Sequence, residues 1–293
     1  MRLAPLLSAP VSAYVRLCAS LDPLWVVSIM TLLSMVRFQE GAWFYSILYP
    51  VLLGLACLFP SLVRREQFWL AVCLVVGSSI ALNWYFIANH TFSLFYWTLA
   101  LLLSCFAHDR LRLLALSARW ILGGIFLFAF IWKLASPDFQ SGATMRYFLS
   151  ATQPLGDSGV ALSSLTSSEL AQNMGAVERL LNTPGTGPTR LIMPPDLAAL
   201  ADLLTRLTQI TEGLVVLILL TPLPERWRWL REASLLFFFA TAYTLLPVAP
   251  LAAQFACLGY AMTSSSRSRA AFIAAFFVYQ LMDLRLGSLW GAG

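Results

Sequence analysis

Residues 115–134 read ALSARWILGGIFLFAFIWKL, with no charged residue between Arg119 and Lys133. A bilayer core about 30 Å thick requires about 20 mostly apolar helical residues. The length and composition of this segment therefore predict a transmembrane helix rather than a surface helix of a soluble domain.

Similar apolar segments recur along the chain. The expected spans are residues 20–36, 43–62, 68–88, 91–107, 115–134, 204–222, 233–247, 249–263 and 270–286. Pro247 and Pro250 leave open whether the chain there forms a tight hairpin or one broken segment, so we expect eight or nine spans. Only helices and closed barrels satisfy the backbone in lipid, and these long runs do not alternate as barrel strands do. The sequence predicts an all-α, polytopic transmembrane helical bundle.

The overall composition also indicates a membrane protein. Apolar residues make up 59% of the 293 residues and charged residues 11%, and the mean hydropathy is +0.75. Soluble domains average about 45–50% apolar and about 25% charged residues, so both a water-soluble and a disordered chain are excluded. The net charge is +5, but no run of basic residues is longer than two. We therefore expect no nucleic-acid partner. The five cysteines form no CxxC pair or Cys/His cluster, so no metal site is expected.

The basic residues predict an orientation. With the N-terminus inside, short inner segments hold twelve of the nineteen basic residues, which the positive-inside rule favours. Residues 1–20 are interrupted by Pro5, Pro10 and Arg16, so we expect an interfacial helix rather than a signal peptide. The expected location is a bacterial cytoplasmic membrane, with the lipid bilayer itself as a partner.

The long segment 135–198 then falls outside. Structureless loops above about 12–15 residues are uncommon, so this segment should fold. Thr166 and Glu169 have the spacing of a capping box that opens a helix to about Leu181. Gly185–Pro188 should break the chain, and residues 194–196 should start the next helix. We expect a small extracytoplasmic helical cap.

Lys133 is the only lysine, against eighteen arginines, and it lies at the outer end of its predicted span. One interpretation is an interfacial cation whose stem lies in lipid. The other is a catalytic base, because a desolvated lysine can lose its proton and arginine cannot.

Two further positions are candidates. Asn89 and His90 lie between the third and fourth spans, on the same predicted side as Lys133, and either cap a helix or contribute to a site. Glu212 lies inside an apolar span near Arg206 and Gln209, where ionisable groups usually face a partner or cavity. A structural pair and a functional, substrate-binding role are both open for Glu212.

Two stretches resemble a known family. Residues 128–149, FAFIWKLASPDFQSGATMRYFL, and residues 84–101, WYFIANHTFSLFYWTLAL, are similar to the lysine segment and the Asn-His helix start of vitamin K-dependent gamma-glutamyl carboxylases. The resemblance covers their transmembrane module, the HTTM domain. It implies that residues 1–293 form one such domain.

The resemblance also implies a chemistry. Lys133 would match the catalytic base that deprotonates reduced vitamin K or another naphthoquinol, His90 the assisting histidine, and Asn89 its polar neighbour in substrate binding. The oxygen-derived base would then permit gamma-carboxylation of a glutamyl peptide on the extracytoplasmic side. No metal is implied.

Two departures leave other functions open. The animal enzyme continues into a large lumenal domain that this sequence lacks, and residues 233–247 contain no histidine where a histidine-containing helix is expected. The alternative is a non-enzymatic membrane subunit or scaffold for a partner protein. A transporter is a third option, although few charges lie within the predicted spans.

Overall fold

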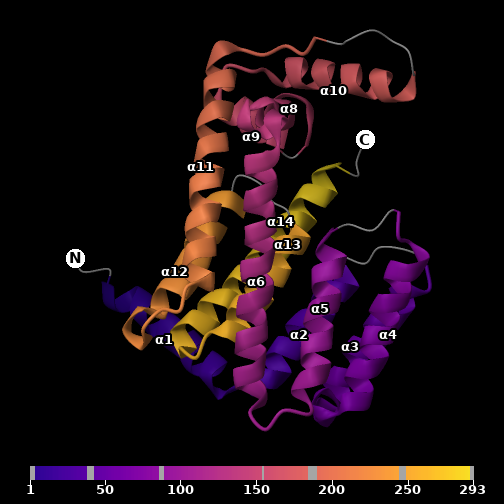
Figure 1. The fold of residues 1–293 in the computed structure, drawn as a ribbon, viewed down its shortest axis with the longest axis vertical. Coiled ribbons are helices and arrows are strands. Elements are labelled where there is room, and N and C mark those ends of the chain that lie inside the picture. The colour runs from indigo at the N-terminus through magenta and orange to yellow at the C-terminus, as the bar shows by residue number, and fades with distance from the viewer. Residues whose placement is uncertain are drawn as a thin grey trace. The chain divides into compact units, whose positions relative to one another are not determined.

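The computed structural model describes residues 4–37, 43–85, 89–153, 155–183, 190–243 and 249–290, and it describes side chains from residue 10 to 281 within these ranges. All secondary structure in these ranges is helical, which confirms the all-α prediction for them (Figure 1). The α-helices are α1 (Ala4–Ser20), α2 (Pro23–Arg37), α3 (Tyr45–Leu58), α4 (Glu66–Leu82), α5 (Asn89–Ser104), α6 (Arg110–Ala135), α7 (Pro137–Gln140), α8 (Ala143–Ala151), α9 (Leu155–Leu162), α10 (Ser167–Asn182), α11 (Pro195–Leu220), α12 (Trp229–Phe238), α13 (Ala249–Met262) and α14 (Ser266–Trp290). Shorter helical turns are η1 (Pro60–Arg64), η2 (Glu225–Trp227) and the π-helical η3 (Phe239–Tyr243).

Each of the nine predicted apolar segments overlaps a helix in the described residues, with bounds that differ by several residues. Helix α11 begins at Pro195, which confirms the helix start predicted at residues 194–196, and it continues through the predicted span that starts at residue 204. Pro195 fits the first turn because it has no N–H to leave unpaired there. Pro247, at the predicted hairpin or break, lies outside the described residues.

Among the described residues, two helices are long and apolar enough to cross a membrane, α6 and α11. A third span results if Pro10–Ser20 and Pro23–Arg37, which are bent by 98°, are counted together. Helices α3, α4 and α13 are apolar but shorter. These lengths are compatible with a membrane protein, and the larger number of eight or nine spans stays a prediction.

The chain divides into two compact units. Unit 1 comprises Met1–Ile125, Ile218–Phe239 and Val248–Gly293, and unit 2 comprises Phe126–Leu217 and Ala240–Pro247. Helix α6 therefore begins in unit 1 and ends in unit 2, and α11 does the reverse.

The core of unit 1 contains buried polar groups that link its helices. Trp97 on α5 donates a hydrogen bond from Nε1 to Thr31 Oγ1 on α2 over 2.9 Å, and Thr31 Oγ1 lies 3.3 Å from Cys257 Sγ on α13. A Cβ at Gly259 would lie 2.4 Å from the Phe272 ring, so the lack of a side chain lets α13 and α14 approach closely. These contacts fix α13 as the central helix of this unit.

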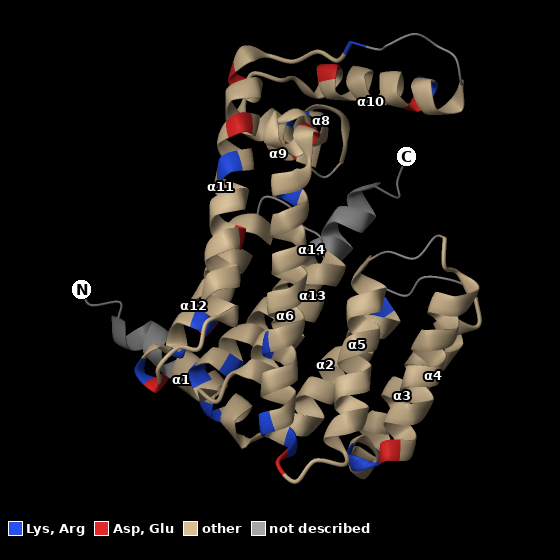
Figure 2. Ribbon diagram, in the orientation of Figure 1, with Lys and Arg blue, Asp and Glu red and all other residues tan. Residues whose placement is uncertain are grey.

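Two of the segments that were predicted to lie inside, around Arg64 and Arg110, are in contact in unit 1. Arg64 forms an ion pair of 2.7 Å with Asp22, and Arg110 donates a hydrogen bond to the carbonyl oxygen of Arg64 over 2.9 Å. Figure 2 shows basic residues clustered where α5 ends and α6 begins. The orientation of this end in a membrane stays a prediction.

In unit 2, residues 135–198 fold largely into short helices. Helices α8, α9 and α10 lie beside the start of α11 (Figure 1), around a core formed by Met145, Leu149, Leu155, Leu165, Leu170, Leu197 and Ala201. The predicted capping box is confirmed, because Thr166 and Glu169 make both of its hydrogen bonds, and α10 ends one residue beyond Leu181. Gly185–Pro188 lies outside the described residues.

A buried asparagine links α10 to the rest of this small core. Asn173 Nδ2 donates to the carbonyl oxygens of Ser150 and Ile192, each over 2.9 Å, and its Oδ1 accepts from the Ile192 N–H over 2.8 Å. Its side chain thereby satisfies backbone groups that lie outside the helical hydrogen-bond pattern. The helices thus form an ordered body at one end of α6 and α11, although its position outside a membrane stays a prediction.

Candidate functional site

Lys133 and Glu212 form a buried ion pair within unit 2. Lys133 lies in the last turn of α6, and its Nζ donates to Oε1 of Glu212 on α11. Only 15% of the Lys133 side chain and 7% of the Glu212 side chain are exposed. The candidate base and the candidate substrate-binding residue of the sequence analysis are therefore in direct contact.

The chain after α6 encloses the lysine. Ser136 caps the short helix α7 by accepting a hydrogen bond from the Phe139 N–H, and Pro137 occupies the first turn. This turn brings the buried Phe139 ring to 5.4 Å from Lys133 Nζ. Gln140 Nε2 then donates to the Lys133 carbonyl oxygen over 2.9 Å, which satisfies a carbonyl at the end of α6.

The Lys133–Glu212 pair joins an amine and a carboxyl group, two groups that can both carry a proton. When the proton is on Lys133, the two groups form an ammonium and a carboxylate. To act as a base, Lys133 would have to be a neutral amine. The second carboxyl oxygen of Glu212, Oε2, is buried and makes no hydrogen bond within the described part of the chain. A buried oxygen without a hydrogen bond is costly.

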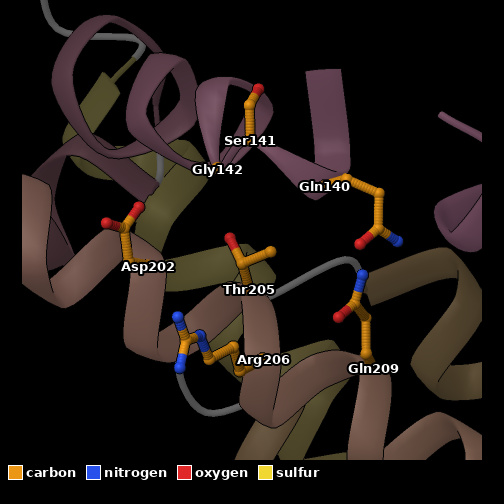
Figure 3. Close-up of a pocket in the computed structure, with 7 residues that line it drawn as sticks. All are labelled: Gln140, Ser141, Gly142, Asp202, Thr205, Arg206 and Gln209. Carbon is orange, nitrogen blue, oxygen red and sulfur yellow. The ribbon is translucent and has the colours of Figure 1, made fainter. Parts of the chain in front are cut away.

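A polar face on α11 leads away from Glu212. Asp202, Thr205, Arg206 and Gln209 are spaced three or four residues apart, so they share one side of the helix. With the turn after α7 they enclose a pocket of about 380 Å³ (Figure 3). The lining residues are Gln140, Ser141, Gly142, Asp202, Thr205, Arg206 and Gln209.

The Asp202 side of this pocket has a fixed geometry. Arg146 Nη2 donates to both carboxylate oxygens of Asp202, over 2.8 and 3.0 Å. Gly142 has a φ of 75°, in the left-handed region that favours glycine. A Cβ at this position would also lie 2.5 Å from Asp202 Oδ1. Glycine is therefore required both by the backbone conformation and by the adjacent carboxylate.

Two lining residues of α11, whose side chains point to different sides of the pocket in Figure 3, have unused donors. Gln209 Nε2 is buried and has no hydrogen-bond partner among the described residues. Arg206 is exposed and makes no ion pair or hydrogen bond with the described residues. Figure 3 shows the side-chain amides of Gln140 and Gln209 facing each other across the pocket. Gln209 also lies one helical turn before Glu212, so the pocket approaches the ion pair along α11.

Asn89 and His90 belong to unit 1. They form the start of α5, where the His90 carbonyl oxygen accepts a hydrogen bond from Ser93 Oγ over 2.9 Å. His90 is half-buried and Asn89 is exposed. Their predicted meeting with Lys133 stays a prediction, since Lys133 belongs to unit 2.

Glu212 pairs with a residue that is distant from it in the sequence. Arg206 and Gln209 are close to it in sequence, but six residues place Arg206 about 120° away around the helix. The partner instead comes from a separate helix, α6, through Lys133. The pocket residues Gln140, Gly142 and Asp202 were also missed, although the polar spacing along 202–209 is visible in the sequence.

Within the described residues, no group of three or more His, Cys, Asp or Glu side chains could hold a metal ion. Models of protein families give no match to this chain, and neither curated proteins nor solved structures give one. The resemblance to the carboxylase membrane module therefore depends on the motifs around Asn89 and Lys133 alone.

Proposed function

We propose that this protein is a multi-pass membrane enzyme of eight or nine spans whose Lys133–Glu212 pair transfers a proton to or from a lipid-soluble quinol. The observation that supports this most directly is the buried ion pair between α6 and α11, because both helices are long and apolar enough to cross a membrane. Ionisable groups within membrane helices are costly, and they commonly mark proton or ligand sites.

The pair has features suited to a phenolic ligand. Glu212 Oε2 is free to accept a hydrogen bond from a ligand hydroxyl within the described surroundings. The Phe139 ring near Lys133 Nζ offers an aromatic face. A quinol would donate its proton to the neutral amine of Lys133. Lys133 would be neutral when Glu212 is protonated in its place, so the carboxyl group of Glu212 would control whether Lys133 can act as a base.

The resemblance to the HTTM module makes this proposal more specific. A reduced vitamin K or another naphthoquinol would supply the oxygen-dependent chemistry that permits gamma-carboxylation. In this proposal Lys133 is the base, His90 assists it and Asn89 contributes to binding. A glutamyl peptide on the extracytoplasmic side is the proposed substrate, and a bacterial cytoplasmic membrane the proposed location.

A second candidate function is a non-enzymatic subunit that holds a partner protein. The same ion pair favours it, because an ammonium and a carboxylate in direct contact also form a structural link between α6 and α11. In that case the polar pair fixes the helices, and no proton is transferred.

One substitution separates these two functions. Lys133→Arg keeps a positive charge beside Glu212 but removes the group that can become a neutral amine. The purified full chain in nanodiscs is supplied with reduced vitamin K, oxygen, bicarbonate and a glutamyl peptide, and epoxide and carboxylated peptide are measured. Arg179→Lys, an exchange at an exposed position of α10, is the control.

For an enzyme, Lys133→Arg should lower turnover by about 100-fold or more, which is typical for loss of a general base, with little change in thermal stability. Equal turnover by the wild type and Lys133→Arg would exclude Lys133 as the base. A wild-type protein with no turnover, purified in a stoichiometric complex that survives Lys133→Arg, would instead support the scaffold.

A further inference from the structure

We propose that the pocket between the turn after α7 and the polar face of α11 binds a phosphate group, with Arg206 and Gln209 as the donors. The pocket lies entirely in unit 2. This proposal does not depend on the quinol chemistry, because it uses different side chains from Lys133 and Glu212.

The charges and donors of the pocket favour an anion. The carboxylate of Asp202 is already neutralised by Arg146, through two contacts of 2.8 and 3.0 Å. Arg206 then remains as a positive charge without an ion pair in the described surroundings, and Gln209 Nε2 is a buried donor without an acceptor. A guanidinium presents several N–H groups in a plane, a geometry that matches the oxygens of a phosphate.

The position of Arg206 along α11 favours a lipid phosphate. Between residues 203 and 220 the only charged residues are Arg206 and Glu212. Eighteen helical residues extend about 27 Å, close to the thickness of a bilayer core. Arg206 therefore lies within one turn of the end of the apolar segment, which is where headgroup phosphates lie.

The surface beside the pocket suits acyl chains. Leu203, Leu207, Ile210 and Leu214 are all exposed and follow one another on α11 at helical spacing. A phospholipid could place its phosphate at Arg206 and its chains along these residues. A water-soluble phosphate offers the same headgroup chemistry without needing the apolar surface.

The test compares lipids that differ only in the headgroup. The purified full chain is exchanged into nanodiscs containing either phosphatidylglycerol or diacylglycerol with the same acyl chains, and bound lipid is counted by native mass spectrometry. Arg206→Gln removes the charge, and Gln209→Leu removes the buried donor. Arg179→Gln makes the same change of charge at an exposed position of α10 in unit 2 and is the control.

We expect Arg206→Gln to reduce bound phosphatidylglycerol about tenfold, the usual effect of losing one hydrogen bond to a charged group. Gln209→Leu should reduce it about threefold, and Arg179→Gln should leave it unchanged. Circular dichroism and a thermal melt show whether each variant is folded. Arg206→Lys serves as a second variant that keeps the charge, and it should retain more lipid than Arg206→Gln.

Calorimetry with inorganic phosphate distinguishes a lipid phosphate from a water-soluble phosphate as the ligand. Arg206-dependent binding of phosphatidylglycerol alone identifies a lipid headgroup, and Arg206-dependent binding of inorganic phosphate identifies a soluble anion. The proposal is overturned if neither phosphate source binds in an Arg206-dependent way, or if Arg179→Gln weakens binding as much as Arg206→Gln.

Discussion

Two buried cations in this protein are satisfied in different ways. Arg231 on α12, in unit 1, is 8% exposed and donates to the carbonyl oxygens of Ile218, over 3.3 Å, and Thr221, over 2.8 Å. These carbonyls lie at the end of α11, where a helix leaves its last carbonyl groups unpaired. Lys133, in unit 2, is instead paired with the carboxylate of Glu212.

The two partners allow different chemistry. A backbone carbonyl cannot take up a proton at neutral pH, so Arg231 stabilises the end of a helix as a permanent charge. A carboxylate can take up a proton, so the Lys133–Glu212 pair has two protonation arrangements. Burial of a cation is therefore not by itself a sign of function, and the nature of its partner decides what it can do.

The largest expected effect comes from breaking the Lys133–Glu212 pair. Glu212→Ala leaves a buried ammonium without its partner and should lower the free energy of unfolding by about 3–5 kcal/mol. The double variant Lys133→Met with Glu212→Leu removes both charges and should be much closer to the wild type. Unfolding midpoints in detergent measure this. A double variant as unstable as Glu212→Ala would show that the loss comes from packing rather than from an unpaired charge.

Removing Arg231 should have a smaller effect. Arg231→Met leaves the two carbonyl oxygens at the end of α11 without their donor and should cost about 1–3 kcal/mol in the same measurement. Arg228→Met is the matched control, because Arg228 is 63% exposed and pairs only with Glu225. Equal losses from the two variants would mean that the carbonyl contacts of Arg231 contribute nothing specific.

A smaller loss of stability is expected at Gly142, which lies against the Asp202 carboxylate that is paired with Arg146. Gly142→Ala places a Cβ against Asp202 at a φ of 75° and should cost about 1–2 kcal/mol from the backbone alone. Gly54→Ala is the control, because Gly54 lies within α3 with open space around it and should gain up to about 1 kcal/mol. Opposite signs for the two substitutions in thermal melts are expected, and a stabilising Gly142→Ala would contradict the assigned conformation.

The helices themselves were predictable from the sequence, because their signals are local. Apolar runs gave α6 and α11, and the spacing of Thr166 and Glu169 gave the start of α10. Each of these signals depends on residues within a few turns of each other, so no knowledge of the tertiary structure was needed.

The site was only partly predictable, because it depends on which helices are neighbours. Lys133 and Glu212 were both recognised as unusual, but they are separated by 79 residues, and no local pattern relates them. The pocket depends on Gly142, whose left-handed φ brings the turn after α7 against Asp202. Contacts of this kind come from packing between elements, which hydrophobic patterns alone do not specify.

The smallest expected effect concerns a carboxylate at the surface, Glu169. Hydrogen bonds from the backbone N–H and the hydroxyl of Thr166 hold the pKa of Glu169 below its usual value of 4.5. Because the pKa is lower in the folded state, the ionised cap stabilises α10 fully above pH 4.5, and this contribution is lost as the pH falls through the lower folded value. Solvent screens such a group, in contrast to Glu212.

Amide hydrogen exchange in the first turn of α10, measured between neutral and acidic pH, tests this. Protection should decrease in acid for the wild type, after correction for intrinsic exchange rates. Glu169→Gln should show a flatter profile, because glutamine keeps a hydrogen-bonding group at this position but does not ionise in this range. Glu178→Gln, an exposed change on the same helix, should retain the wild-type profile. If Glu169→Gln loses protection in acid as steeply as the wild type, ionisation of Glu169 does not control this helix end, and the loss must come from carboxylates elsewhere in unit 2.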